Sequence, residues 1–360
     1  MGKNIVEFCL SDGIGGLELF VGSCYQYFKD KTNTHFIIQK DTKLDNFFDK
    51  ENKFYIKRNK LFPLLPAFKL AKYIDENNID IIHFHWTKDI NVVVLAKLLS
   101  NKKPKIIQTR HMAMTRFKDD FYHKWLYKNI DTIHAITNQV KEQINKFIPN
   151  DISPKVKMNY IGCEASHINY TKVDTLKQKY NLKDEFIVGI VGRIEQNKGQ
   201  DLVIEAISSL KDLNIKLMIV GIAMQDEYLN KLKNLVKELN IENKVIFTGF
   251  TKDVNEHMQL FDVNILATPN ETFGLVLIEA MANGISVIAT NKAGPLEIID
   301  DKINGLHFDR SSKDLSDKIK LLYENEEFKN KLAQNGKTKA QKEFDKYKQL
   351  DKLYDLFENI

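Results

Sequence analysis

The stretch DVNILATPNETFGLVLIEAMANG, residues 262–284, has the pattern of a strand, a turn and a buried helix. The apolar run ends at Thr268, and the turn from Pro269 leads to a helix that begins near Gly274. That helix ends at Asn283-Gly284, a common C-terminal stop signal. A strand that runs directly into a helix is the repeating unit of a parallel sheet covered by helices.

The same alternation of short apolar runs and helical patterns continues along the whole chain. The runs in the first half are 4–10, 35–39, 80–85, 105–110, 131–137 and 157–162, and those in the second half are 186–192, 215–221, 244–250, 262–268, 285–290 and 304–308. We therefore predict an α/β protein of two doubly wound, Rossmann-like domains facing a cleft. The predicted domains are residues 1–165 and 166–340, and a final helix over 341–360 is expected to pack back on the first.

Composition indicates a globular protein with a basic first half. The chain has 360 residues, 43% of them hydrophobic and 28% charged, and no apolar run is long enough to span a bilayer. Its start lacks the features of a signal peptide, and three widely spaced cysteines predict neither a disulfide framework nor a zinc site. Residues 1–170 carry 26 Lys and Arg against 18 Asp and Glu, which favours an anionic partner or a lysine-rich solvated surface.

Two acids stand out in the opening stretch. Glu271 lies in the turn ahead of the helix, and Glu279 follows after seven residues, within the apolar helix. A carboxylate in such a helix is costly unless a partner or a polar ligand binds it. The helix start at Gly274 offers free amides at the C-terminal edge of the sheet. Two carboxylates there suit a polyhydroxylated ligand, whereas the alternative for Glu279 is a buried acid with a structural partner.

Two cations follow another strand end. Arg193 comes directly after the apolar run 186–192, and Lys198 stands just before the next helix. Arginine offers a planar fork to phosphate oxygens and lysine a mobile point charge. We predict that they converge on a diphosphate, the alternative being two surface cations in a turn. The chain has no Asp-x-Asp pair, which favours protein cations over a divalent metal at that position.

Other candidates lie in the first half. Gly15 and Gly16 follow the first strand, where their amides could approach a phosphate or an acceptor. His111 follows the strand 105–110 and is predicted to be functional, whereas His85 is taken as structural. A zinc site would need a further ligand at suitable spacing, and none is apparent in the sequence.

The chain resembles the retaining family 4 glycosyltransferases of the GT-B fold. The resemblance rests on the acid, seven residues and acid at Glu271 and Glu279, with Phe273-Gly274 between them. It extends to five further segments, GRIEQNKGQDLVIEA (192–206), AGPLEIIDDKINGLHF (293–308), GIGGLE (13–18), DIIHFH (80–85) and TRHMA (109–113).

The resemblance implies roles for individual residues. By it, Glu271 holds the donor sugar, Glu279 holds the nucleotide ribose, and His111 contacts the sugar near its reacting carbon. The implied catalytic set is His111, Arg193, Lys198 and Glu271. The donor-binding set is Gly15, Gly16, Gly192, Arg193, Lys198, Gly249, Phe250, Glu271, Thr272, Phe273, Gly274, Leu275 and Glu279.

These observations predict a cytoplasmic, metal-independent, retaining transferase of the hexosyltransferase type, with no cofactor and no nucleic-acid partner. It would move a sugar from a nucleotide diphosphate sugar (UDP or GDP) to a glycan or lipid-linked acceptor in cell-surface polysaccharide synthesis. The alternatives are a sugar-nucleotide epimerase of the same fold and a non-catalytic subunit that binds a sugar nucleotide or anionic lipid. Residues 115–129 interleave aromatic and basic side chains, which predicts a reversible contact with anionic membrane or an ordinary packed helix.

Overall fold

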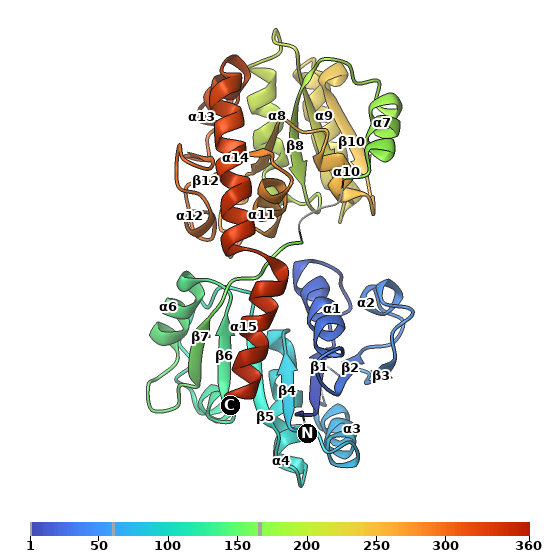
Figure 1. Cartoon of the computed structure of the whole chain (residues 1–360), viewed down its shortest axis with the longest axis vertical. Coiled ribbons are helices and arrows are strands. Elements are labelled where there is room, and N and C mark those ends of the chain that lie inside the picture. The colour runs from blue at the N-terminus through green and yellow to red at the C-terminus, as the bar shows by residue number, and fades with distance from the viewer. Residues whose placement is uncertain (1, 60–61, 165–167) are drawn as a thin grey trace. The chain divides into compact units, whose positions relative to one another are not determined.

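The computed structural model describes residues 2–59, 62–164 and 168–360. The chain folds into two compact units. The first comprises Met1–Ile161 together with Lys348–Ile360, and the second comprises Gly162–Tyr347. Each unit is a parallel sheet with helices on both faces (Figure 1).

The first unit is built on a seven-stranded parallel sheet in the order β3-β2-β1-β4-β5-β6-β7. Its strands are β1 Ile5–Cys9, β2 Thr34–Ile38, β3 Lys53–Tyr55, β4 Ile81–Phe84, β5 Lys105–Arg110, β6 Thr132–Ala135 and β7 Lys155–Met158. The central strands β1 and β4 are buried along their whole length, as expected for a sheet covered on both sides.

The helices of the first unit connect these strands and cover the sheet. They are α1 Gly16–Phe28, α2 Lys43–Phe47, α3 Leu64–Glu76, the 3₁₀ turn Thr87–Asp89, α4 Ile90–Leu99, α5 Phe121–Lys128 and α6 Asn138–Phe147. The last helix of the chain, α15 (Lys346–Glu358), joins this unit from residue 348. There the ring of Phe357 packs against Phe28 and His83, at centroid distances of 5.1 and 5.0 Å.

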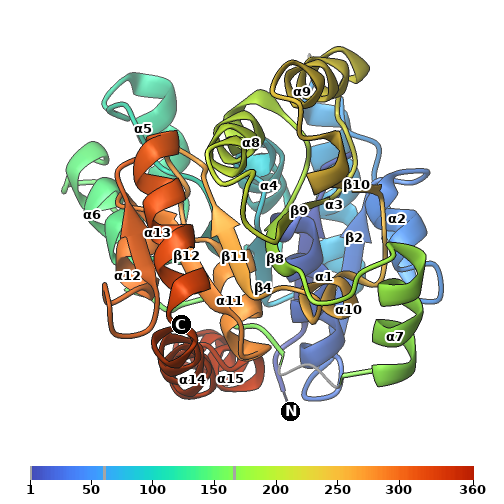
Figure 2. The same ribbon diagram turned by 90° about the horizontal axis from the view of Figure 1, so that it is seen from above.

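The second unit is built on a six-stranded parallel sheet in the order β10-β9-β8-β11-β12-β13. Its strands are β8 Phe186–Val191, β9 Ile215–Val220, β10 Val245–Gly249, β11 Val263–Leu266, β12 Ser286–Thr290 and β13 Leu306–Phe308. Its helices are α7 Tyr170–Lys179, α8 Gln200–Ser208, α9 Asp226–Glu238, α10 Val254–Met258, α11 Leu275–Ala282, α12 Pro295–Ile298, α13 Ser312–Glu324 and α14 Glu326–Glu343, with 3₁₀ turns at Gln196–Lys198 and Glu242–Lys244. Seen from above, α8 and α9 lie on one face of this sheet and α11 on the other (Figure 2).

The predicted fold class is confirmed, with small differences in the strands. Strand β3 was not predicted because Lys53–Tyr55 is short and only half-buried. Strand β7 begins at Lys155, two residues before the predicted run at 157, because its alternating exposed and half-buried residues give no continuous apolar signal. In both sheets the strand order reverses once, between β1 and β4 in the first and between β8 and β11 in the second. Such a reversal point is where doubly wound sheets bind ligands.

Candidate active site

The reversal point of the second sheet brings together two of the predicted segments. Strands β8 and β11 are parallel neighbours, so their carboxyl ends lie at the same edge. Arg193 and Lys198 follow β8, and Glu271 follows β11. Residues separated by more than seventy positions in the sequence therefore meet at one edge of the sheet.

The cations at this edge bind two different carboxylates. The Nζ atom of Lys198 lies 3.1 Å from Oε2 of Glu271, and both side chains are about one-quarter exposed. The guanidinium of Arg193 lies 3.0 Å from the carboxylate of Glu195, and half of its side chain is exposed. The structure thus joins Lys198 to Glu271 directly, whereas Arg193 stands at the same strand end with a partner of its own.

Helix α11 starts where the sequence predicted it, next to Gly274. Gly274 precedes the helix with φ of 108°, a region that side chains with a Cβ rarely adopt. The Gly274 backbone therefore turns sharply, and the helix begins one residue later, at Leu275. The unpaired amides of its first turn and the positive end of its dipole favour an anion or an acceptor oxygen.

The structure shows the surroundings of the Glu279 carboxylate. It lies in the middle of α11, which is otherwise apolar, and its side chain is half-buried. Burial raises the pKa of Glu279 to about 7. Among the residues that the structure describes, no hydrogen bond or ion pair engages its carboxylate. Burial raises the pKa of the Cys163 thiol to about 12, and the charge of Glu279 contributes to that rise. No structural partner of Glu279 is therefore found in that part of the chain.

Three glycines mark the ends of neighbouring strands in this sheet. Gly192, Gly221 and Gly249 follow or end β8, β9 and β10, and the Gly221 amide donates to the Gly249 carbonyl at 3.2 Å. A Cβ on Gly221 would lie 1.9 Å from the Gly192 carbonyl oxygen, so only glycine allows this approach. A Cβ on Gly192 or Gly249 would meet open space, which leaves their backbone accessible to a ligand.

The remaining donor-site candidates differ in exposure. Phe250 is 64% exposed after β10, and Thr272 and Leu275 are half-buried. Phe273 is buried, and its ring packs against Phe344 at a centroid distance of 5.9 Å. Its side chain therefore belongs to the core of the unit, and only its backbone is placed to contact a ligand.

The candidates of the first unit lie at the carboxyl edge of the other sheet. Gly15 caps α1 and Gly16 is its first residue. His111 follows β5, and its Nε2 atom lies 3.2 Å from Nδ1 of His85, which follows β4. Burial lowers the pKa of His111 to about 3, so its imidazole is neutral at physiological pH. The ring of Phe20 packs edge-on against both imidazoles.

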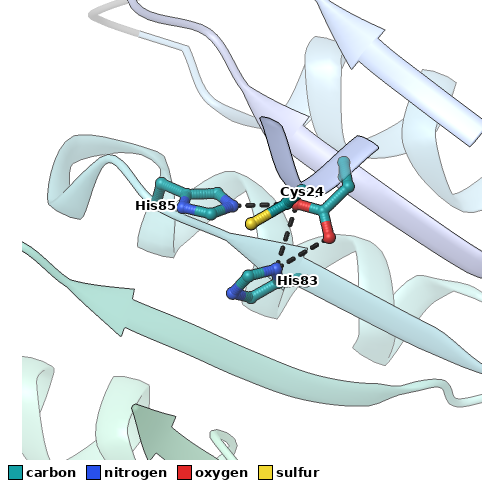
Figure 3. A group of neighbouring side chains, drawn as sticks. Cys24, His83 and His85 are labelled. Carbon is teal, nitrogen blue, oxygen red and sulfur yellow. Dashed lines mark hydrogen bonds and ion pairs between the residues drawn. The ribbon is translucent and has the colours of Figure 1, made fainter. Parts of the chain in front are cut away.

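The first unit contains a buried polar cluster that the sequence did not predict. Cys24, His83 and His85 point toward one another, and their potential ligand atoms and those of Glu7 lie within 4.8 Å of each other (Figure 3). Such side chains can coordinate a divalent cation. Here, however, both oxygens of Glu7 are already within 2.8–3.0 Å of imidazole nitrogens, as in hydrogen bonds. This cluster has no local sequence pattern, because β1 and β4 are far apart in the chain and adjacent only in the sheet.

The aromatic and basic segment 115–129 contains both packed and exposed side chains. Leu126 and Tyr127 are buried in the core, and Trp125 is packed against it. By contrast, Phe117 is 57% and Phe121 89% exposed. One side of α5 therefore packs as an ordinary helix does, and the other presents aromatic rings to solvent. Within the described ranges, no helix is both long and apolar enough to cross a bilayer.

Comparison with solved structures identifies the architecture. The chain superposes with a TM-score of 0.87 on the Anabaena protein HepE, crystallised with UDP and glucose, at 19% identity and over the full length of both chains. It also superposes on a glycosyltransferase from Rickettsia africae with a TM-score of 0.88, at 23% identity over 99% of this chain and 98% of the other. Two Rossmann-like units with these neighbours define the GT-B fold.

Sequence comparison identifies the family. The model of the group 1 glycosyl transferases matches residues 172–339, and the glycosyl transferase 4-like model matches residues 13–138. An uncharacterized glycosyltransferase of Methanocaldococcus jannaschii is 29% identical over 78% of this chain and 76% of its own length. The N-acetylgalactosamine-N,N'-diacetylbacillosaminyl-diphospho-undecaprenol 4-alpha-N-acetylgalactosaminyltransferase of Campylobacter jejuni is 26% identical over 95% of both chains. The chain belongs to the family 4 glycosyltransferases and is a sugar-transferring enzyme of the GT-B fold.

Proposed function

We propose that this enzyme transfers a sugar, with retention and without a metal ion, from a UDP- or GDP-sugar to a glycan or lipid-linked acceptor. The observation that carries the proposal is the pair of acids at the edge of the second sheet. Glu271 is paired with Lys198 in the turn before α11. Glu279 is the fifth residue of that helix, and among the described residues no cation forms an ion pair with it. The proposal assigns Glu271 to the sugar hydroxyls and Glu279 to the ribose diol.

The leaving group of such a reaction is the nucleoside diphosphate. Its negative charge grows in the transition state, and groups already aimed at that charge lower the barrier. Arg193, Lys198 and the amides at the start of α11 are the donors available at this edge. They would perform the electrostatic work that a divalent metal performs in other enzymes.

Retention is supported by the resemblance of the acid motif. In the mechanism that this resemblance implies, the acceptor attacks on the face that the diphosphate leaves, and a donor phosphate oxygen takes its proton. That mechanism needs no side-chain nucleophile. Glu271, the acid nearest the proposed sugar position, is engaged with Lys198, which fits a binding role.

The lipid-linked acceptor is proposed from two observations. The Campylobacter relative, aligned over 95% of both chains, is named for a diphospho-undecaprenol substrate. The first unit also presents exposed aromatic rings on α5 beside basic residues, which suits peripheral contact with an anionic membrane and a cytoplasmic enzyme.

Slow hydrolysis of sugar nucleotides tests the proposal without knowledge of the acceptor. The purified protein is incubated with UDP- and GDP-sugars, with and without EDTA, and the released nucleoside diphosphate and sugar anomer are measured. Hydrolysis of one donor, unchanged by EDTA and with retained configuration, is expected. Loss of activity in EDTA would refute metal independence, and an inverted product would refute retention. An interconverted sugar still linked to its nucleotide would favour an epimerase.

A further inference from the structure

A continuous line of hydrogen bonds crosses the core of the first unit and ends at His111. Each link joins two side chains, or a side chain and a carbonyl, within 2.6–3.2 Å, and all but the outermost groups are buried. In order, the members are the Asn159 carbonyl, His134, Thr109, His83, Glu7, His85 and His111. This line is called the polar network below.

The direction of the polar network is set at its inner end. A carbonyl only accepts, so His134 Nε2 donates to the Asn159 oxygen at 2.7 Å. Burial lowers the pKa of His134 to about 4, so the neutral ring has a bare Nδ1. The hydroxyl of Thr109 must donate its single proton to that nitrogen, at 2.9 Å. Its oxygen can then only accept, and His83 Nε2 donates to it at 2.6 Å.

His83 and Glu7 share one proton. The Nδ1 atom of His83 lies 2.8 and 3.0 Å from the two oxygens of Glu7, and two bare acceptors would repel at that distance. Burial keeps the pKa of His83 well below its ordinary value and raises the pKa of Glu7 to about 7. Whether the proton lies on the carboxyl or on the imidazole, the pair has no net charge, as a fully buried site requires.

The outer half of the polar network follows from this pair. In either arrangement, Oε2 of Glu7 accepts from His85 Nε2, at 2.8 Å. Burial lowers the pKa of His85 to about 3, so this neutral ring has a bare Nδ1. That nitrogen faces His111 Nε2 at 3.2 Å, and the proton between them must come from His111. His111, itself neutral, is then left with a bare Nδ1.

We propose that Glu7, His83 and His85 are positioning residues that fix His111 as the neutral tautomer with its proton on Nε2. Among the described residues, no hydrogen bond engages His111 Nδ1. This nitrogen is therefore an acceptor for a ligand hydroxyl, and His111 neither carries a positive charge nor donates a proton through it. The place of His111 in the transfer site rests on the proposed function, whereas its tautomer rests on the network alone.

The tautomer is measurable without donor or acceptor. Long-range ¹H–¹⁵N spectra of the ¹⁵N-labelled full chain separate the two neutral tautomers and the imidazolium of each histidine. Loss of one signal set in His111→Asn assigns His111, and His35→Asn serves as the control. His35 is in the same unit but bonds to Tyr73 outside the network. We expect His111 as the Nε2-protonated form at pH 7. The opposite tautomer or an imidazolium would overturn the proposal.

Two substitutions of Glu7 separate positioning from packing. In Glu7→Gln the carboxamide can donate to His83 and accept from His85, so the His111 tautomer is retained. In Glu7→Met neither link exists, His85 is free to reverse, and His111 shifts toward the Nδ1-protonated form. We expect kcat of Glu7→Met to lie about two- to tenfold below that of Glu7→Gln, as for one lost hydrogen bond. An unchanged His111 tautomer in folded Glu7→Met contradicts the proposal.

Thr109→Val removes the hydroxyl link at the other end of the network with little change in the shape of the side chain. Without the hydroxyl, the Nε2 proton of His83 loses its acceptor, but His83 and Glu7 keep both of their protons because a net charge at this buried site is costly. His85 still donates to Glu7, so the His111 tautomer is unchanged. A His83 ring that carries its only proton on Nδ1, in the wild type or in this variant, would refute the assigned direction, even if Glu7→Met fails to fold. These spectra remain decisive for the network if the transferase reaction itself is not found.

Discussion

Lys198 Nζ lies 3.1 Å from Glu271 Oε2, and the pair joins the loops that follow two neighbouring strands, β8 and β11. The pair therefore stands at the point where the strand order of the second sheet reverses. The lysine holds the acid in place before donor binds. It also carries a positive charge that a diphosphate would share.

Loss of either cation should slow the reaction more than it disturbs folding. We expect Arg193→Ala and Lys198→Ala each to lower kcat/KM on the order of 10²-fold, as for loss of a charge-stabilising donor. The matched control is Lys172→Ala, which removes an exposed ion pair with Asp253 in the same unit. Wild-type kinetics in Arg193→Ala or Lys198→Ala would remove that residue from the diphosphate site.

Nucleotide affinity should depend on the protonation of Glu279. Its pKa is about 7 in the free protein, and ribose hydroxyls that donate to the carboxylate would lower it in the complex. Affinity for a nucleoside diphosphate should therefore be full above pH 7 and fall by up to about tenfold per unit as pH drops below it. Calorimetric titration from pH 5.5 to 8.5 measures this. Glu279→Gln supplies the control, because it keeps only the titration of the diphosphate itself. Equal pH slopes in both proteins would refute the assignment.

The titration of Glu279 has the opposite effect on the stability of the free protein, which falls as pH rises. Its folded pKa lies above the ordinary value of 4.5. The stability it contributes is therefore complete below about pH 4.5 and is lost as pH rises through about 7. We expect Glu279→Gln to melt at a higher temperature than the wild type at pH 8 and to lose this advantage at pH 5. The difference between the two proteins cancels the similar contribution of Glu7, whose pKa is also raised.

Substitution of His111 should affect turnover more than nucleotide affinity. His111 belongs to the first unit, whereas the proposed ribose and diphosphate ligands belong to the second. We expect His111→Ala to lower kcat about tenfold or more and to change the Kd of the nucleoside diphosphate by less than about twofold. The matched control is His35→Ala. If affinity falls as far as kcat does, His111 is a structural residue.

The exposed rings near α5 make membrane contact testable by flotation. The protein should float with vesicles that contain anionic lipid and be released by salt, because lysines attract the surface and aromatic rings enter it. Phe121→Ser, at the most exposed ring, should reduce the floating fraction, whereas Phe47→Ser removes an exposed ring from α2 of the same unit and should not. Equal flotation of both variants would exclude α5 as the contact.

The sequence predicted the features that depend on local residue patterns. Strand and helix alternation gave both sheets, and the position of Glu271 and Arg193 after apolar runs placed them at strand ends. It did not predict that Lys198 binds Glu271, because that contact depends on β8 and β11 being neighbours. For the same reason it missed the link between Glu7 and the histidines of β4. Contacts between strands far apart in the chain follow from sheet order, which hydrophobic periodicity does not encode.

The central claim is that Glu271 binds the sugar and Glu279 the ribose, and one set of calorimetric titrations tests it directly. Each of Glu271→Gln and Glu279→Gln is titrated with the free nucleoside diphosphate and with the intact donor. Glu279→Gln should weaken the affinity for both ligands about ten- to a hundredfold, which corresponds to the loss of one carboxylate–hydroxyl hydrogen bond. Glu271→Gln should weaken only the affinity for the intact donor. If Glu279→Gln leaves both affinities unchanged and alters only the melting temperature, the acid is a structural group and the claim is wrong.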